Sequence, residues 1–292
     1  MRHAALLFNP RAGRRRGAHA LEQVTAQLAR GFRLEVLPTR GPEHCRELAL
    51  RAVAERLDAV FALGGDGTLR VVAGALAGSQ TALGPLPGGT TNVLAGAFGL
   101  PVGDPAAAAR ALAHAEAREM DVGRCGDDVF LMQVSGGLDA RVMAEVDPRW
   151  KRRVGKLAVA AAGLAAWARY EFPLFELEVD GAPTVATGFV VTNLAEYAGA
   201  YRIVPQARAD DRQLELLLFR GRRRRDALAF ALALARGRHL ARADVELRAV
   251  ERVTLIGPGA AQLQADGDPF VADPPLEIRL SSRRLRVLAP AS

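Results

Sequence analysis

The chain contains 292 residues, of which 50% are apolar and 24% are charged. This length is more typical of two domains than of one, and the composition excludes a disordered or low-complexity chain. The formal charge of +7 at pH 7, carried almost wholly by arginine, indicates either an arginine-rich solvated surface or an anionic partner such as a nucleotide or a membrane.

Short apolar strands alternate with amphipathic helices over residues 1–122, which we expect to form the first domain. The strands are expected at 4–8, 32–38, 58–63 and 82–87, and the helices at 17–31, 42–55, 68–78 and 92–98. This alternation predicts a parallel sheet with helices on both faces. Because ligands of such sheets bind beyond the carboxyl ends of the strands, the loops that follow the strands are the candidate site.

Residues 123–283 change to short segments in which apolar and polar residues alternate with period two, separated by turn signals. This pattern predicts an antiparallel sheet or sandwich, interrupted by helices near 139–170 and 226–241. Asp180 and Gly181 form the turn of an expected hairpin. A last strand near 284–290 fits either domain. The predicted fold class is α/β followed by antiparallel β.

We expect a cytoplasmic protein from the cysteine content, the N-terminal residues and the length of the apolar runs. Cys45 and Cys125 lack metal-ligand spacing and predict neither a disulfide framework nor a zinc site. The N-terminus begins a strand at once, so we expect no signal peptide. The longest apolar runs, 157–168 and 227–235, are shorter than the ~20 residues that cross a bilayer, so membrane contact would be peripheral. No helix-turn-helix, zinc-finger or aromatic RNA-binding pattern is present, so nucleic acid is not expected.

The segment GGDGT, residues 64–68, follows the expected third strand. We expect Gly64, Gly65 and Gly67 to adopt positive φ and to let backbone amides approach a phosphate. Thr68 is expected to open the next helix, whose N-terminus favours an anion. Since a carboxylate repels phosphate, Asp66 indicates a magnesium-nucleotide arrangement or, alternatively, a tight turn capped by Asp. The spacing matches neither a Walker A loop nor a dinucleotide fingerprint.

Two further loops have the same position relative to the predicted sheet. The segment PGGTTN, residues 87–92, places two glycines and two hydroxyls before a helix, which fits a phosphate loop or an ordinary helix cap. The segment NPRAG, residues 9–13, follows the first strand. The three loops converge at one edge if the sheet is parallel.

Residues 219–242 combine a run of arginines with an apolar-faced helix. A basic amphipathic segment of this kind can rest on anionic lipid. The alternative is an ordinary helix of the second domain with a solvated basic start.

Six motifs, in this order, resemble the diacylglycerol kinase catalytic domain family in its bacterial lipid-kinase and sphingosine-kinase-like branch. They are FNPRAG at 8–13, GGDGT at 64–68, PGGTTNVLA at 87–95, SGGLDARV at 135–142, VPQARADDRQLELLLF at 204–219 and ADGDP at 265–269. The likeness covers nearly the whole chain. It implies a phosphofructokinase-like nucleotide domain, a C-terminal β-sandwich, and an active site in the cleft between them.

The resemblance implies a kinase of phospholipid metabolism that uses ATP and Mg²⁺ to phosphorylate the hydroxyl of a lipid alcohol such as diacylglycerol. The implied nucleotide-binding residues lie in the loops after the strands: Asn9, Thr39, Gly64, Gly65, Asp66, Gly67, Thr68, Gly89, Thr90 and Asn92. Asp66 would organise magnesium and phosphates, and Asp139 would extend that acidic network.

The resemblance also implies a general base and a structural cation site. Asp268 stands where the family has the last carboxylate of an Asp-Gly-Glu motif, with one methylene less, and Asp266 would support it. A structural Mg²⁺ would be held by the side chain of Asp211 and the main-chain carbonyls of Arg208 and Gln213, since this hard cation prefers oxygen ligands.

The chain also departs from the family pattern elsewhere. Arg70 and Val71 stand where many members carry an Asn-Glu pair, Val93 stands where many carry aspartate, and Arg212 replaces the usual glycine of the cation loop. Two alternatives therefore stay open: an NAD kinase, which also carries GGDGT, and a lipid-binding protein of the same fold that has lost turnover. The identity of the lipid and the oligomeric state are not specified by the sequence.

Overall fold

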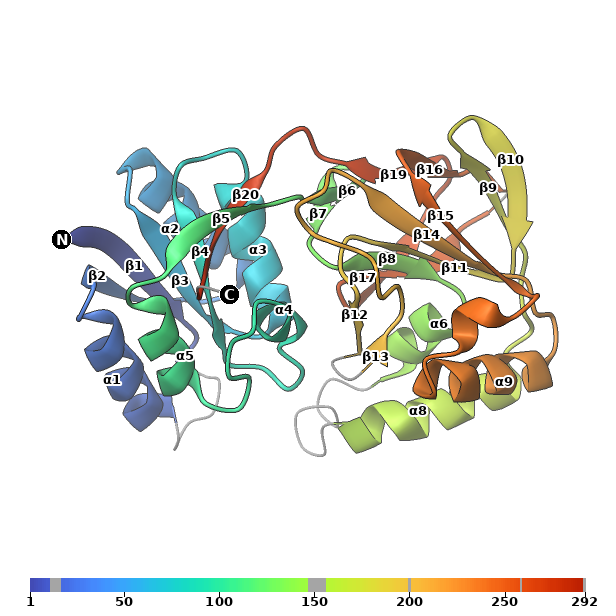
Figure 1. The fold of residues 1–292 in the computed structure, drawn as a ribbon, viewed down its shortest axis with the longest axis horizontal. Coiled ribbons are helices and arrows are strands. Elements are labelled where there is room, and N and C mark those ends of the chain that lie inside the picture. The colour runs from blue at the N-terminus through green and yellow to red at the C-terminus, as the bar shows by residue number, and fades with distance from the viewer. Residues whose placement is uncertain (11–16, 147–155, 199–200, 258, 291–292) are drawn as a thin grey trace. The chain divides into compact units, whose positions relative to one another are not determined.

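The computed structural model describes residues 1–10, 17–146, 156–198, 201–257 and 259–290. The chain divides into two compact units (Figure 1). The first unit comprises Met1–Val122 and Ser282–Ser292, and the second comprises Gly123–Ser281. Among the described residues, no helix combines the length and the apolar character that a bilayer span requires.

A six-stranded sheet forms the centre of the first unit, with its strands in the order β2-β1-β3-β4-β20-β5. Its elements are β1 (Arg2–Phe8), α1 (Gly17–Leu28), β2 (Phe32–Pro38), α2 (Pro42–Ala54), β3 (Ala59–Gly64), α3 (Asp66–Leu76), β4 (Ala82–Pro87), α4 (Val93–Ala97), α5 (Pro105–Leu112), β5 (Glu116–Met120) and β20 (Leu285–Ala289). Strands β2, β1, β3, β4 and β20 run parallel, whereas β5 pairs antiparallel with β20. The last strand of the chain therefore belongs to the first sheet.

Helices cover both faces of this sheet because each carries an apolar stripe at helical spacing (Figure 1). On one face, Leu28 of α1 and Leu112 of α5 join a core that includes Leu6 and Phe61 of the sheet. Helices α2 and α3 pack together on the other face. This layering leaves the ends of the strands as the accessible edge of the sheet.

The second unit contains two six-stranded sheets, ordered β10-β9-β16-β19-β6-β7 and β15-β14-β11-β8-β17-β18. The strands are β6 (Gly123–Cys125), β7 (Asp128–Phe130), β8 (Gln133–Gly136), β9 (Phe175–Val179), β10 (Ala182–Ala186), β11 (Gly188–Thr192), β12 (Glu196–Tyr197), β13 (Tyr201–Arg202), β14 (Leu214–Phe219), β15 (Val245–Val250), β16 (Arg252–Leu255), β17 (Ala261–Ala265), β18 (Asp268–Ala272) and β19 (Leu276–Leu280). The helices are α6 (Leu138–Glu145), α8 (Lys156–Arg169), α9 (Arg224–Ala235) and the 3-10 turn η1 (His239–Ala241). Strands β12 and β13 pair separately.

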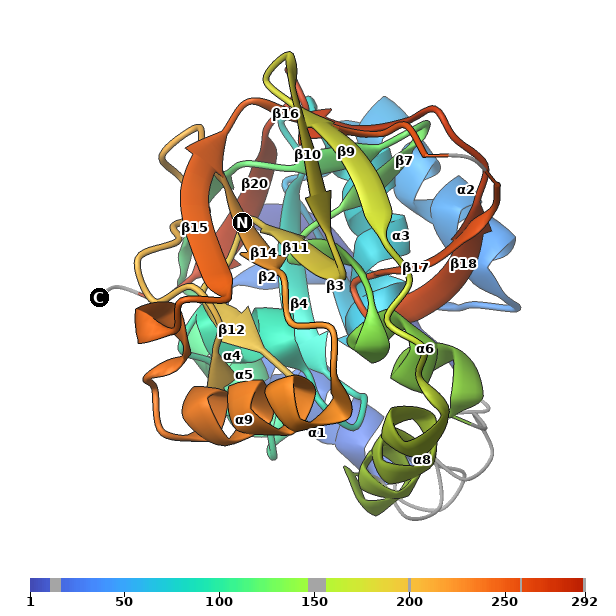
Figure 2. The ribbon, with the colours of Figure 1, turned by 90° about the vertical axis from the view of Figure 1, so that its right-hand side faces the viewer.

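The two sheets of the second unit enclose one apolar core (Figure 2). Alternate side chains of β9 and β14 point into it, as expected for strands with one buried face. Phe175 and Phe189, from opposite sheets, pack edge to face with ring centroids 5.4 Å apart. The predicted fold class, an α/β domain followed by an antiparallel β-sandwich, is confirmed.

Three local predictions can be compared with the structure directly. The hairpin between β9 and β10 turns at Asp180 and Gly181, with φ of 50° and 85°, as the sequence predicts. Helix α3, however, begins at Asp66 rather than at Thr68, because the extended Gly65 already accepts hydrogen bonds from the amides of Thr68 and Leu69. Within the described residues, the helical region predicted near 139–170 contains α6 and α8; residues 147–155 lie outside the described part of the chain.

Candidate functional site

The carboxyl end of the first sheet brings the predicted nucleotide loops together. In the parallel register Phe8 pairs with both Pro38 and Leu63, and Gly64 pairs with Pro87. The segments that follow these strands therefore meet at one edge: Asn9, Thr39, Gly64 to Thr68, and Gly89 to Asn92. Residues 11–13 of the first loop lie outside the described residues.

The loops after β3 and β4 touch through their backbones. A Cβ added to Gly89 would lie 2.6 Å from the Cα of Gly65, and one added to Gly88 would lie 2.9 Å from the amide nitrogen of Gly64. The amide of Gly88 also donates to the carbonyl of Gly64 at 2.8 Å. No residue with a side chain fits at this crossing, so the edge exposes main chain.

The predicted positive φ of the first glycine loop is wrong. Gly65 has φ of −86° and ψ of 179°, and neither Gly64 nor Gly67 adopts positive φ. Space, and not dihedral freedom, explains the first two glycines, since a Cβ on Gly64 would also lie 2.6 Å from the Cβ of Thr68. The amides can still approach an anion closely, because the glycines carry no side chain of their own.

Asp66 joins the two loops electrostatically. Its Oδ2 accepts the amide of Val93 at 3.2 Å, and its Oδ1 accepts the amide of Leu94 at 3.1 Å. These are first-turn amides of α4, which have no partner within the helix. Asp66 therefore caps α4 from the neighbouring loop and fixes the direction of that helix. This role is related to the alternative expected from the sequence, in which Asp66 caps a tight turn.

The polar side chains of this edge divide into buried and exposed ones. Asn92 is 4% exposed and has φ of 50°, and its side chain accepts the amide of Gly89 at 2.8 Å and donates to Gly89 and Val102. The hydroxyl of Thr39 donates to the carbonyl of Phe8 at 3.2 Å. Asn92 and Thr39 thus shape the loops, whereas Asn9 and Thr90 are exposed and accessible to a ligand.

In the second unit, Asp266 holds the turn between β17 and β18. Its carboxylate accepts three amides, from Leu131 and Met132 at 2.8 Å and from Gln133 at 3.0 Å. Asp266 has φ of 51° and Gly267 has φ of 87°, which is a two-residue hairpin turn. The turn ends at Asp268, which is exposed.

The same turn is fixed from its other side by a chain of hydrogen bonds. The amide of Gly267 donates to Oε1 of Gln264, and Nε2 of Gln264 donates to the hydroxyl of Ser135, both at 2.6 Å. Ser135 in turn donates to Oδ2 of Asp139 at 2.6 Å, and Tyr197 donates to the same oxygen at 3.2 Å. The hydrogen-bond chain thus runs from the predicted residue Asp139 to the turn that precedes Asp268.

The carboxyl of Asp139 is buried, and its pKa is shifted. Burial raises its pKa above 3.8, and hydrogen bonds from Ser135, the amide of Ala140, Tyr197 and Gln264 offset this only in part. Burial, and next the negative charge of Asp139, raise the pKa of Tyr197. Ser135 donates its hydroxyl proton to Asp139, which lowers the pKa of the carboxyl, but the effect of burial is larger.

Sequence reasoning assigned no role to three residues of these sites: Ser135, Gln264 and Tyr197 complete the hydrogen-bond chain. Gly88, one of the two glycines expected in the PGGTTN loop, forms half of the loop crossing. Ser135 and Gln264 could have been found, because Ser135 begins the SGGLDARV motif and Gln264 directly precedes ADGDP, and a polar side chain in a buried strand needs a hydrogen-bond partner.

The predicted cation loop lies between β13 and β14. Oδ1 of Asp211 accepts the amide of Gln213 at 3.1 Å, and Arg208 pairs with Asp210 at 3.2 Å. Arg212 takes φ of 64°, the left-handed conformation that glycine would adopt more easily. Within the described residues, no group of three or more His, Cys, Asp or Glu side chains is arranged to hold a metal. A cation here would depend on main-chain carbonyls.

Comparisons with known proteins agree on both units. Residues 3–125 match the model of the diacylglycerol kinase catalytic domain, and residues 132–289 match that of the YegS C-terminal NAD kinase beta sandwich-like domain. A protein of Mycobacterium tuberculosis named diacylglycerol kinase is 30% identical, covering 97% of this chain and 94% of that protein. One of Pseudomonas aeruginosa, named "Probable lipid kinase YegS-like", is 35% identical over 66% of this chain and 65% of its own.

Solved structures share the fold of this chain. One from Bacillus anthracis str. Sterne has a TM-score of 0.83 at 21% identity, covering 98% of this chain and 95% of that one. Another from the same organism, described as a diacylglycerol kinase, has a TM-score of 0.72 at 17% identity, covering 98% and 96%.

Substituting Gly89→Ala is expected to lower the free energy of unfolding by about 1–3 kcal/mol, because the new methyl group must push the two loops apart. Chemical denaturation measures this change. Gly103→Ala is the matched control, since nothing lies within 4 Å of its added Cβ. Equal stabilities of the two variants would contradict the close crossing.

Substituting Asp139→Asn is expected to flatten the dependence of stability on pH. Because the pKa of Asp139 is raised in the folded protein, the unfolded chain loses this proton at lower pH. The contribution of Asp139 to the free energy of unfolding is therefore complete below pH 3.8 and is lost as the pH rises through the folded pKa. Asparagine has no such proton. Denaturation at a series of pH values from about 4 upward should show a smaller decline for Asp139→Asn than for wild type or for exposed Asp128→Asn; parallel curves would refute the assignment.

Proposed function

The chain belongs to the diacylglycerol kinase catalytic domain family and is a lipid kinase, and we propose that it transfers the γ-phosphoryl group of ATP to the hydroxyl of a lipid alcohol such as diacylglycerol. The observation that carries this proposal is the crossing of two glycine loops at the carboxyl end of a parallel sheet. Such an edge offers backbone amides and the N-termini of helices to a polyphosphate.

The ATP phosphates would lie against the loops of Gly64 to Thr68 and Gly89 to Asn92, with Asn9 and Thr39 at the neighbouring strand ends. Asp66 would act on the phosphates through α4, because its carboxylate holds the amides of Val93 and Leu94. Val93 takes part through its amide, so the absence of a carboxylate side chain there leaves this contact intact. A magnesium ion bound with ATP would neutralise phosphate charge, and Asp66 is the carboxylate of this loop pair that suits it.

Asp268 would accept the proton of the lipid hydroxyl. Its position at the end of a turn pinned by Asp266 and Gln264 supports this role, since a general base must be held within hydrogen-bond reach of its substrate. Asp139 would serve as a positioning residue, acting through Ser135 and Gln264.

A structural Mg²⁺ in the second unit would be held by Asp211 and by the carbonyls of Arg208 and Gln213. The carboxylate of Asp211 suits this ion. Among the described residues, its Oδ1 accepts one amide and its Oδ2 accepts none. This leaves a carboxylate oxygen for a hard cation. The ion would add rigidity to the loop before β14.

The lipid acceptor also implies a location. A diacylglycerol-like substrate resides in a bilayer, so we propose that the protein works in the cytoplasm with peripheral contact to an anionic membrane.

Transfer of labelled phosphate from ATP to a lipid extract tests the proposed function. Wild-type protein should yield a phosphorylated lipid, and Asp268→Asn should reduce the rate about 100- to 10,000-fold while ATP still binds. Asp268→Glu, which restores the longer carboxylate, should retain activity, and exposed Asp273→Asn is the control. Labelling of NAD instead of lipid would identify an NAD kinase, and lipid binding without any transfer would identify a protein that has lost turnover.

Removing the proposed structural cation should lower stability even without nucleotide. At about 100 times its dissociation constant, Mg²⁺ should stabilise the wild type by about 2.7 kcal/mol. Asp211→Asn should abolish the Mg²⁺-dependent part of the unfolding free energy, whereas Asp210→Asn should keep it. A wild type whose thermal unfolding is unaffected by Mg²⁺ or by a chelator would exclude the site.

A further inference from the structure

The solvent-facing side of α9 carries basic and apolar residues in place of the usual mixed charges. Its exposed residues recur at helical spacing and define what we call the α9 face: Arg224, Arg225, Leu228, Ala231, Leu232 and Ala235. Leu228 is 49% exposed and Leu232 is 48% exposed. A helix that only borders a core is expected to be polar on this side, so the leucines of the α9 face are unaccounted for by folding.

The opposite side of α9 packs against the second unit. Ala227 is buried, and Phe230 and Leu234 pack against the cluster that includes Ile203 and Leu217. Phe230 also lies 5.2 Å from Phe219, centroid to centroid. Replacing the leucines of the α9 face would therefore leave the attachment of the helix in place.

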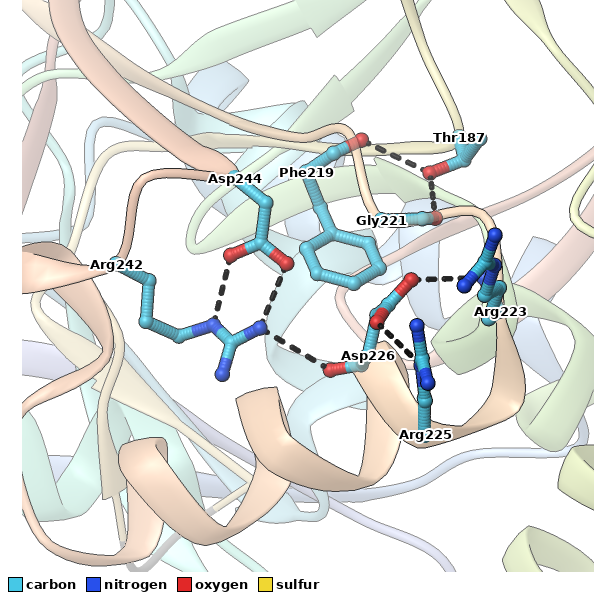
Figure 3. Close-up of polar contacts among 8 residues, drawn as sticks. All are labelled: Thr187, Phe219, Gly221, Arg223, Arg225, Asp226, Arg242 and Asp244. Atoms are coloured by element: carbon cyan, nitrogen blue, oxygen red, sulfur yellow. Dashed lines mark hydrogen bonds and ion pairs between the residues drawn. The ribbon is translucent and has the colours of Figure 1, made fainter.

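Four consecutive arginines, 222–225, stand at the start of α9, and of these four only Arg225 has an acidic partner for its guanidinium among the described residues. The carboxylate of Asp226 accepts the amide of Arg223 at 3.0 Å and lies 3.8 Å from the guanidinium of Arg225 (Figure 3). Arg242 is occupied by Asp244 at 2.6 Å. Among the described residues, the guanidinium groups of Arg222, Arg223 and Arg224 have no acidic partner. They also stand at the positive end of the helix dipole, which disfavours cations.

Neighbouring segments extend the apolar and basic character. The indole N–H of Trp167, in α8, donates to the carbonyl of Arg224 at 2.9 Å, which ties α8 to the start of α9. Arg222 lines a surface hollow together with Leu174 and Val185, which are 54% and 43% exposed. Apolar side chains thus accompany the arginines beyond α9 itself.

We propose that the α9 face, together with Arg222 and Arg223, docks the protein on an anionic phospholipid bilayer. The arginines would lie among the lipid headgroups, and Leu228 and Leu232 would enter the acyl boundary. A second copy of this chain fits poorly, because pairing two such faces would oppose two sets of unneutralised arginines. A nucleic acid would meet leucines where it needs polar or aromatic contacts.

This inference rests on the proposed function only in that a lipid kinase must reach a bilayer to meet its substrate. The docking surface itself is a property of the second unit, and the crossing of the glycine loops plays no part in it. Binding and phosphoryl transfer can therefore fail separately.

Co-sedimentation with vesicles of phosphatidylcholine, with and without phosphatidylglycerol, tests the proposal on the full chain. Arg222→Gln/Arg223→Gln/Arg224→Gln should weaken binding to the anionic vesicles about 100-fold, at about five-fold per arginine. Leu228→Gln/Leu232→Gln should weaken it about 10-fold, because half-exposed leucines gain only part of their burial energy at the membrane. Wild-type binding should require the anionic lipid and should fall with added salt.

Two matched variants control for net charge and for surface apolarity. Arg33→Gln/Arg46→Gln/Arg110→Gln removes the same charge from exposed sites of the first unit, and Leu50→Gln/Val102→Gln changes apolar residues that are 43% and 45% exposed there. Both should bind like wild type. Equal losses in the control and α9 variants would overturn the proposal, as would a dimer in solution that dissociates on Leu228→Gln/Leu232→Gln.

Activity on diacylglycerol dispersed as monomers and on diacylglycerol in vesicles separates docking from catalysis. The α9 variants should phosphorylate a short-chain diacylglycerol dispersed as monomers at the wild-type rate, and should be slow only on vesicles. A wild type that binds vesicles but transfers no phosphate would end the kinase proposal and leave docking intact. Full activity of the α9 variants on vesicles would end the docking proposal and leave the kinase intact.

Discussion

The close contact between the loops after β3 and β4 is the constraint on which the first site depends. The Cα of Gly65 and the backbone of Gly89 approach so closely that a methyl group at Gly89 would lie 2.6 Å from Gly65. Asp66 then fastens the crossing, because it accepts two amides of α4. A phosphate can therefore approach main chain directly, at a place where helix N-termini favour negative charge. The close packing of the two loops requires glycine, and glycine leaves the backbone amides accessible to phosphate.

The second unit uses an aspartate in the same way. Asp266 accepts three amides and holds a left-handed turn whose next exposed acid is Asp268. In both GGDGT and ADGDP, the aspartate next to glycine accepts backbone amides and thereby fixes the loop. The missing carboxylate at Val93 fits this pattern, since that residue contributes an amide to Asp66 whatever its side chain is.

Sequence reasoning reached those features that depend on local periodicity. Alternating strands and helices place Asn9, Thr39, Gly64 and Gly89 at one edge, and the parallel register brings them there. Sequence reasoning could not predict contacts between residues that are far apart in the chain. The contact of Asp66 with Leu94 joins residues 28 positions apart, and that of Gln264 with Ser135 joins residues 129 apart. The conformation of Gly65 was also beyond it, because glycine permits positive φ without requiring it.

The arginines after β14 were visible in the sequence, whereas the exposure of Leu228 and Leu232 required knowing which side of α9 packs on the core. The two features matter together because they act over different ranges. Charges of the arginines attract an anionic surface within a Debye length of about 10 Å at 0.1 M salt, and salt weakens them. Burial of leucine is short-ranged and is not screened. A surface with both can be drawn to a bilayer by charge and held there by apolar contact, which suits the proposed reaction, in which ATP would come from water and the acceptor from lipid.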